Sequence, residues 1–263
     1  MDFLYMVIGW YTDPWFIHFP IMAGLIGMAA FLVYALPWTL LAWLDPEWAR
    51  PYRIQTQPFE VATYFWPTLG RIAFNLLMLF LVMILAWPLL RLVPIHAGTL
   101  PEWWLILLQL AFFVVLDDFL YYWMHRWMHS NKWMLRNVHS IHHRLRNPFA
   151  LAGNYVHWIE FVMTVGLVLV GPILVGAHIV VVYIWVAFRQ LEAADGHTGY
   201  HFPWDPMRLV PGYRGALFHD FHHSRYSGNY AGFFPYVDGF YGTYARDYPP
   251  FAEKQRDGTR GDS

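Results

Sequence analysis

The sequence predicts an all-α integral membrane protein, in which a bundle of spanning helices carries a cytoplasmic, histidine-rich helical cap that holds a di-metal site. Composition is the first observation: 57% of the 263 residues are hydrophobic and 13% are charged, which is too apolar for an ordinary soluble domain. The second is a series of apolar runs of about 20 residues, the length that crosses a bilayer as a helix. The third is that ten of the 14 histidines fall into four short blocks.

Three apolar runs predict single spans near residues 17–44, 72–93 and 102–121. Pro20 and Pro37 interrupt the first of them, and proline removes a backbone donor from a helix. The first ten residues contain no Lys or Arg and no small-residue cleavage site follows them. We therefore expect the first span to persist in the mature protein rather than to be removed as a signal peptide.

A fourth apolar run, 161–188, is too long for one comfortable crossing and contains Gly171 and Pro172 near its middle. Histidine blocks lie on both sides of it, at 125–143 and 197–223, and a joint site requires both sides to emerge on one face of the membrane. Because only an even number of crossings allows this, we predict a helical hairpin that turns near Gly171 and Pro172.

The distribution of Lys and Arg predicts the orientation. Thirteen of the 17 lie at or beyond Arg126, and residues 45–71 carry three more, whereas residues 1–16 and 94–101 carry none. Basic residues concentrate in short cytoplasmic loops. We therefore expect the histidines to face the cytoplasm, in an endoplasmic reticulum membrane or a bacterial inner membrane.

Several classes of function are excluded by charge and composition. A formal net charge of −1 gives no broad surface for nucleic acid. The absence of cysteine excludes disulfides, thiolate catalysis and iron–sulfur clusters, and no Gly-x-Gly-x-x-Gly motif for a dinucleotide occurs. We expect one membrane-embedded domain over residues 1–263, with a catalytic region at about 115–243.

The clustered histidines are candidate metal ligands. On a helix, residues three and four apart share a face, so each block presents two or three imidazoles to one point. A lone histidine is usually a core or surface residue, but repeated blocks favour metal binding, and ten imidazoles are more than one ion can hold. The four blocks are His125 and His129; His139, His142 and His143; His197 and His201; and His219, His222 and His223.

Acidic residues near the blocks are candidates to support these ligands. Asp118, Tyr122, His125 and His129 follow steps of four, three and four residues, which places them on one helical stripe. Asp118 is therefore expected to accept the second ring proton of a ligand histidine and so fix its tautomer, as outer carboxylates do. The similar candidates near the other blocks are Glu160, Glu192, Asp195 and Asp220.

Ligand chemistry narrows the choice of metal. Imidazole suits zinc, copper, iron and nickel, so zinc is expected to be able to replace the native ion. Two metals held beside a bilayer by neutral nitrogen ligands suit activation of dioxygen by a pair of irons, close enough to oxidise a C–H bond of a lipid.

We also expect Gly199, inside the third block, to lie in a wall of the lipid pocket.

Three of the blocks, at 125–129, 139–143 and 219–223, have the order His-x-x-x-His, His-x-x-His-His and His-x-x-His-His. In this order and spacing the sequence resembles the fatty acid hydroxylase and sterol desaturase superfamily of membrane di-iron proteins. Within that superfamily, residues 189–204 and 228–230 are similar to the pattern of the sterol 4α-methyl oxidases.

The resemblance implies a monooxygenase that oxidises the 4α-methyl group of a sterol with dioxygen and with electrons from NAD(P)H. The electrons would come through an external carrier, which is a haem cytochrome, a ferredoxin or a reductase. The alternatives are a hydroxylase or desaturase of another lipid, such as a fatty acyl chain, a sterol ring or a carotenoid, and more distantly a histidine-rich metal transporter. A transporter would carry its ionisable residues inside the spans, whereas these histidines lie just outside them. A haem protein needs only one or two axial ligands and leaves most of the histidines unexplained.

Overall fold

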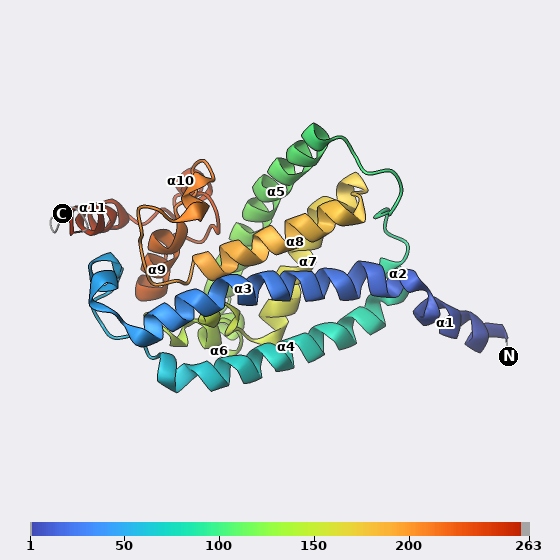
Figure 1. The fold of residues 1–263 in the computed structure, drawn as a ribbon, viewed down its shortest axis with the longest axis horizontal. Coiled ribbons are helices and arrows are strands. Elements are labelled where there is room, and N and C mark those ends of the chain that lie inside the picture. The colour runs from blue at the N-terminus through green and yellow to red at the C-terminus, as the bar shows by residue number, and fades with distance from the viewer. Residues whose placement is uncertain (1, 259–263) are drawn as a thin grey trace.

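The computed structural model describes residues 2–258, which form helices and no strand, apart from two isolated bridges. Figure 1 labels most of the helices. In chain order the elements are α1 (Asp2–Thr12), α2 (Pro14–Phe16), η1 (Ile17–Ile21), α3 (Met22–Leu44), η2 (Glu47–Tyr52), α4 (Val61–Leu90), α5 (Trp103–Ser130), α6 (Lys132–Asn137), η3 (His139–Arg144), η4 (Ala150–Asn154), α7 (Trp158–Val175), α8 (Ile179–Asp195), η5 (Pro206–Leu209), α9 (Gly215–Arg225), α10 (Pro235–Phe240) and α11 (Tyr248–Gly258).

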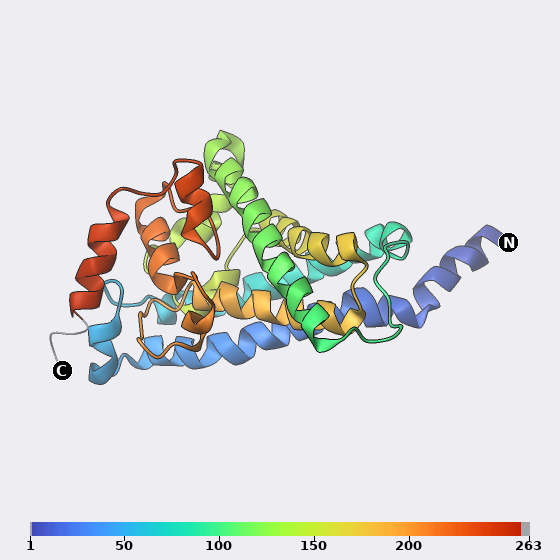
Figure 2. The same ribbon diagram turned by 90° about the horizontal axis from the view of Figure 1, so that it is seen from above.

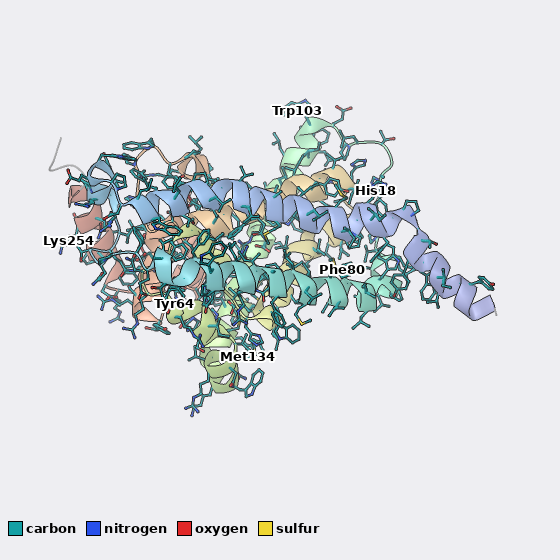
Figure 3. All side chains as sticks on the ribbon, turned by 60° about the horizontal axis from the view of Figure 1, so that its bottom comes forward. His18, Tyr64, Phe80, Trp103, Met134 and Lys254 are labelled. Carbon is teal, nitrogen blue, oxygen red and sulfur yellow. The ribbon has the colours of Figure 1, made fainter. Side chains whose placement is uncertain are left out.

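Four helical stretches are long and apolar enough to cross a membrane: Pro14–Leu44, Val61–Leu90, Trp103–Ser130 and Trp158–Val175. They cover the apolar runs from which the spans were predicted, and several run further than predicted. Apolar side chains project outward along the bundle, as Phe80 shows in Figure 3. The outer face therefore has the character that hydrocarbon requires.

Local geometry explains the differences at the ends of the spans. Pro20 lies in the π-helical turn η1, which absorbs the missing donor, and Pro37 lies inside α3 without ending it. The second span begins at Val61, before the predicted residue 72, and Thr68 in this added part of the helix is fully buried. The third span continues past residue 121, so that one helix carries the chain from the membrane into the first histidine block.

The predicted hairpin is present, but its turn lies later than predicted. α7 ends at Gly176, which has φ +60° and is therefore in the left-handed conformation that favours glycine. Pro172 lies inside α7, and at Gly171 a Cβ atom would come 2.7 Å from Phe113 of α5. Gly171 thus serves close helix packing, not chain reversal.

The arrangement of the helices brings the histidine blocks together. α3, α4, α7 and α8 run side by side, α5 crosses them, and α9–α11 gather at the end opposite α1 (Figures 1 and 2). The C-terminal ends of α5 and α8 and the N-terminal end of α7 lie at the α9 end. The two sides of the hairpin therefore supply one site, as the parity of crossings predicted.

Buried polar groups in the spans fix the segment that leads into the hairpin. Thr39 of α3 accepts a hydrogen bond from the backbone N–H of Leu151 (3.0 Å), and Asn75 of α4 donates to the carbonyl of Val156 (3.1 Å). Backbone groups away from water must be paired in this way. These bonds hold the segment around residues 151–156, which lies between η3 and α7, against α3 and α4.

Candidate metal centre

Nine of the ten predicted histidines form two compact groups at the cap end of the bundle. Within each group, the ligand atoms lie within 4.8 Å of one another. Group A is His125, His129, His139, His143 and His222, and group B is His142, His197, His219 and His223.

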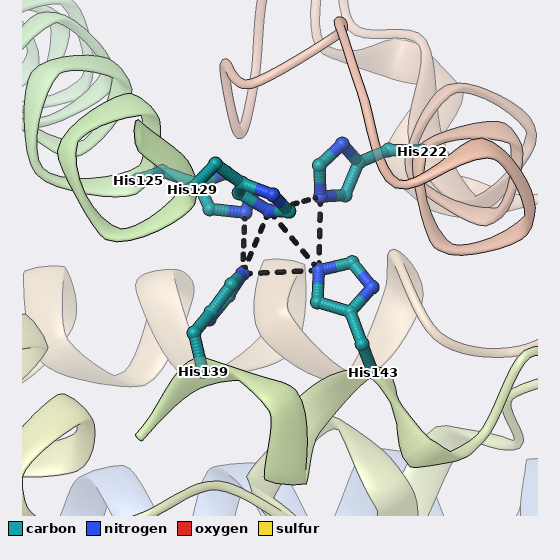
Figure 4. A group of neighbouring side chains, drawn as sticks. All are labelled: His125, His129, His139, His143 and His222. Atoms are coloured by element: carbon teal, nitrogen blue, oxygen red, sulfur yellow. Dashed lines mark hydrogen bonds between the residues drawn. The ribbon is translucent and has the colours of Figure 1, made fainter. Parts of the chain in front are cut away.

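Group A joins three elements, as Figure 4 shows. His125 and His129 come from α5, His139 and His143 from η3, and His222 from α9. The Nε2 atom of His139 lies 2.9 Å from that of His129, 3.0 Å from that of His143 and 3.1 Å from that of His125. The Nε2 atom of His222 lies 3.1 Å from that of His129 and 3.2 Å from that of His143. Five rings thus point at one centre.

Group B has the same construction with four rings. The Nε2 atom of His197, just after α8, lies 3.0 Å from that of His219 and 3.2 Å from those of His142 and His223. His219 and His223 are 3.1 Å apart at the same atoms. All four residues are buried.

The two groups interlock through η3 and α9. In η3 the outer histidines, His139 and His143, belong to group A, and His142 belongs to group B. In α9 the assignment is reversed, because His222 belongs to group A and the other two histidines to group B. In the α-helix α9, residues at i and i+4 share a face, whereas adjacent residues diverge by about 100°. One His-x-x-His-His block can therefore supply two centres at once.

The proton positions show why these nitrogens need a cation between them. Four rings direct Nδ1 at a backbone carbonyl, which only accepts, so Nδ1 carries the proton and Nε2 of the neutral ring presents a lone pair. Lone pairs that face each other within 2.9–3.2 Å repel. The four pairs are His125 with Tyr230 (2.7 Å), His222 with Gly228 (2.8 Å), His197 with Ala193 (2.7 Å) and His223 with Leu145 (3.2 Å).

Burial keeps the rings neutral. It lowers the pKa of His197 and of His222 to about 4 and, with repulsion from neighbouring imidazoles, moves the pKa of five others well below the ordinary value. Those five are His139, His142, His143, His219 and His223. Neutral imidazole is the form that binds metal.

The spacing fits transition-metal ions. Metal–imidazole bonds of about 2.0–2.1 Å place neighbouring ligand nitrogens about 2.9–3.4 Å apart in octahedral or tetrahedral geometry, which includes the separations in both groups. Imidazole nitrogens suit iron, zinc, copper and nickel alike. The nine histidines thus fit two such ions, one per group.

His201 does not join either group. The His-x-x-x-His spacing at 197–201 predicts a shared helical face, but α8 ends at Asp195 and Gly199 has φ +73°. The helical register is therefore lost between the two histidines. The backbone N–H of His201 instead donates to the carbonyl of Tyr52 (2.8 Å).

Glu160 is the acidic candidate that contacts a group histidine. One of its carboxylate oxygens accepts a hydrogen bond from Nδ1 of His139 (2.9 Å), and both residues are buried. The other carboxylate oxygen is buried without a hydrogen-bond partner. Glu160 therefore fixes the tautomer of His139.

Asp118 acts on a loop instead of a histidine. Its carboxylate accepts the backbone N–H groups of Gly232 (2.9 Å), Phe233 (2.7 Å) and Phe234 (3.2 Å). The helical stripe from Asp118 to His129 exists, but the aspartate at its start lies too far back along α5 to reach the rings. The expectation that Asp118 bonds a ligand is wrong.

The remaining acidic candidates also bond elsewhere. Ligands lie near them in sequence, but the carboxylates themselves bond to other groups, which sequence spacing does not reveal. Glu192 pairs with Arg189, Asp195 accepts from Tyr34 (2.8 Å) and Tyr213 (2.8 Å), and Asp220 accepts from Gln55 (2.8 Å).

A loop that the sequence analysis did not single out for this role supports group A. Two carbonyls of residues 226–230 accept a ring N–H of that group: Gly228 from His222 and Tyr230 from His125. Asp238 holds the loop by accepting the backbone N–H groups of Tyr230 and Ala231 (both 2.8 Å). Backbone acceptors leave no side-chain signature, and only the glycine at 228, with φ +77°, signals an unusual chain path.

Two adjoining cavities lead from the bundle interior to group B. An apolar cavity of about 200 Å³ lies between α3, α4, α7 and α8, and a more polar one of about 80 Å³ touches His142, His197 and His219. Both are lined by Arg189 and Gln190. A lipid chain in the first cavity would therefore point its end at group B.

A buried ion-paired cluster surrounds Arg189, which lines both cavities. Nε of Arg189 donates to Asp117 of α5 (2.8 Å), and its guanidinium also pairs with Glu192. Ionisable groups at this depth are costly and are usually retained for function.

Gly199 lies away from both cavities. A Cβ atom there would come 2.4 Å from the ring of Phe59 and 2.7 Å from the carbonyl of Pro148. The expectation that Gly199 forms a wall of the lipid pocket is therefore wrong, because the residue sits in a tight backbone packing contact.

Comparison with known proteins places this geometry among lipid enzymes. The family model described as fatty acid hydroxylase matches residues 110–243. The chain is 41% identical over 171 residues to very-long-chain aldehyde decarbonylase GL1-11 of Oryza sativa subsp. indica, covering 64% of each chain. It is 39% identical over 166 residues to methylsterol monooxygenase 2-2 of Arabidopsis thaliana, covering 62% of each.

A longer match extends over most of the chain. Methylsterol monooxygenase 1-3 of Arabidopsis thaliana is 32% identical over 248 residues, which cover 89% of this chain and 84% of that protein. The first two matches span less than two thirds of those relatives. No solved structure matches the chain.

Proposed function

The chain belongs to the fatty acid hydroxylase family, and we propose that it is a membrane oxygenase whose two histidine groups hold two iron ions and which oxidises a C–H bond of a lipid. Dioxygen is the oxidant, and NAD(P)H supplies the electrons through a separate carrier: a haem cytochrome, a ferredoxin or a reductase. The chemistry such a metal pair supplies when bound is the reduction of dioxygen and the oxidation of an unactivated C–H bond. Zinc is expected to bind as an inactive substitute.

The observation that carries this proposal is the convergence of unprotonated Nε2 atoms next to an apolar cavity. Group B touches the polar cavity through His142, His197 and His219. The apolar cavity behind it is lined largely by residues of the spans, such as Ala23, Leu79 and Val165. These residues exclude water and orient a lipid chain, while the carbonyls of the cap hold the ring protons away from the centres.

For the substrate we propose a sterol, oxidised at its 4α-methyl group. Two Arabidopsis relatives named as methylsterol monooxygenases support it. So does the polar lining next to group B, which includes Asn154, Thr164 and Gln190 and suits the alcohol, aldehyde and carboxylate that stepwise oxidation of a methyl group produces.

The second candidate is a lipid aldehyde or another lipid. The rice relative is named as an aldehyde decarbonylase, and the same polar lining suits a carbonyl group. Hydroxylation or desaturation of a fatty acyl chain, a sterol ring or a carotenoid needs the same metal centres and a different fit in the apolar cavity.

We propose that the histidine groups face the cytoplasm, in an endoplasmic reticulum or bacterial inner membrane. The distribution of Lys and Arg supports this side. The helix ends that carry both groups lie together with the basic segments of the chain.

The test is product analysis in lipid nanodiscs loaded with iron. The protein receives a 4-methylsterol, a long-chain aldehyde or an acyl lipid, together with a reductant and ¹⁸O-labelled dioxygen, and the lipids are analysed by mass spectrometry. The expected result is a sterol with ¹⁸O in the hydroxyl group formed on its 4α-methyl carbon. Conversion of the aldehyde alone would replace the sterol proposal, and absence of any oxidised lipid at full iron content would refute the oxygenase.

A further inference from the structure

Tyr226 adopts a conformation that is unusual for a bulky residue. It ends α9 with φ 63° and ψ 2°, a left-handed position that glycine or asparagine usually occupies. A tyrosine persists in such a conformation only when its surroundings hold it. This position therefore calls for a reason beyond ending a helix.

The conformation folds the Tyr226 ring over a ligand of group A. The ring centroid lies 4.5 Å from that of His143, with 36° between the planes, and the hydroxyl donates to the His143 carbonyl at 2.5 Å. One half-buried residue thus contacts a ligand of group A through both its ring and its hydroxyl.

The Tyr226 ring also lies next to a basic surface. The guanidinium of Arg146 lies 5.8 Å from the ring centroid. Arg144, Arg146 and Arg225 are all exposed, and the nearest acidic partner is Asp247, which pairs with Arg225 at 3.4 Å. Residues 119–159 contain five Lys and Arg and no Asp or Glu, so the surface around Arg144 and Arg146 has little to neutralise it.

We propose that Tyr226, Arg144, Arg146 and Arg225 form the docking surface for an acidic one-electron carrier protein, and that electrons pass through the Tyr226 ring to group A. This inference rests on the proposed oxygenase function. Hydroxylation of one C–H bond consumes one dioxygen, two electrons and two protons and yields one hydroxyl group and one water. Two reduced carriers are therefore oxidised in each cycle, each docking once.

Carrier binding is measured first on metal-free protein, so that the result does not depend on turnover. The probe is an acidic [2Fe–2S] ferredoxin of plant type, titrated into nanodiscs of neutral phosphatidylcholine at low and high salt. Arg144→Glu/Arg146→Glu should weaken binding by about tenfold or more at low salt and should flatten its salt dependence. Arg208→Glu/Arg214→Glu carries the same charge change in η5 and just before the N-terminal end of α9, and this variant should bind like the wild type.

Electron transfer is measured next on iron-loaded protein with the reduced ferredoxin bound. Tyr226→Asn removes the ring with a residue that tolerates the left-handed conformation, so it should slow oxidation of the ferredoxin while metal content and ferredoxin affinity stay unchanged. Tyr226→Phe keeps the ring and should transfer electrons at nearly the wild-type rate. A small chemical reductant bypasses the surface and should reduce all variants equally.

These measurements separate the docking proposal from the oxygenase proposal. Unchanged ferredoxin affinity in the Arg144/Arg146 variant, or a Tyr226→Asn rate equal to wild type, overturns the docking surface even if lipid is oxidised. A loss of binding to anionic vesicles without a loss of ferredoxin binding also overturns it, because the basic surface would then contact lipid headgroups. If the chemical reductant drives no oxidation of any lipid, the oxygenase fails while the affinity measurement still tests the surface.

Discussion

Glu160→Gln gives the sharpest test of how the protein controls its metal centres. In the wild type, a buried carboxylate oxygen accepts from Nδ1 of His139 at 2.9 Å. Glutamine keeps the shape and an acceptor oxygen but removes the negative charge. The change therefore isolates the effect of the charge on a single ligand.

The magnitude follows from the hydrogen bond. A bond to a charged group contributes about 1.5–3 kcal/mol and a neutral one about 0.5–1.5 kcal/mol, so the variant loses about 1–1.5 kcal/mol of support for His139. That corresponds to about a tenfold weaker metal affinity, the lower end of the range for outer-sphere partners. Glu160→Ala leaves the His139 N–H buried and unpaired, and should cost up to about 100-fold.

The assay is a zinc titration of detergent-solubilised protein in competition with a chelating dye, which resolves two dissociation constants. The dissociation constant of group A should rise in Glu160→Gln. The constant of group B should stay at its wild-type value, because His139, the ligand that Glu160 bonds, belongs to group A. Asp220→Asn is the control, since Asp220 adjoins a ligand in sequence but bonds to Gln55. Equal losses in both variants, or no loss in Glu160→Gln, would refute the reasoning.

Four further results are expected. His222→Ala should lower metal content at group A and His142→Ala at group B, each leaving one ion per chain by elemental analysis; loss of both ions in either variant would show that the groups do not load separately. Gly24→Leu places its Cβ in open space beside the apolar cavity and should reduce turnover of a bulky lipid with unchanged iron content; equal turnover would place the substrate elsewhere. Metal-free protein should lose stability below about pH 6.5, the ordinary histidine pKa, because histidines of the unfolded chain then become protonated while the buried rings stay neutral. The loss should reach about 1.4 kcal/mol per ring by pH 5.5, and a melting temperature that does not fall between pH 8 and pH 5.5 would contradict this. Single cysteines at Thr12 and Ser224 should label from opposite sides of sealed vesicles, and labelling from one side would overturn the predicted topology.

Hydropathy and helical spacing were enough to predict most of the fold and most of the histidines that come together. Long apolar runs can only be satisfied as spans, and the parity of crossings required the hairpin to return the chain to the same end. The turn at Gly176 was missed because Gly171 and Pro172 resemble a turn in sequence, although Gly171 is small to admit Phe113. Close packing and chain reversal use the same residue type, so composition does not separate them.

The site was less predictable where it depends on the backbone. His201 shares its spacing with true helical pairs, and only the end of α8 excludes it. The carbonyls of residues 226–230 could not be found from side-chain types, because any residue supplies a carbonyl. Asp118 was placed on the correct helical stripe, but its partner is the loop at 232–234, which is remote in sequence.

The interlocking of the two groups makes the distance between the centres independent of the bilayer. Because η3 and α9 each serve both groups, the gap is set within a single helical turn and not by the tilt or spacing of the spans. Stretching, thinning or changing the lipid composition of the membrane should leave it unchanged. A one-residue insertion between His139 and His142, by contrast, would rotate the following histidines of this 3₁₀ helix by about 120° and would displace one ligand of each centre, His142 of group B and His143 of group A.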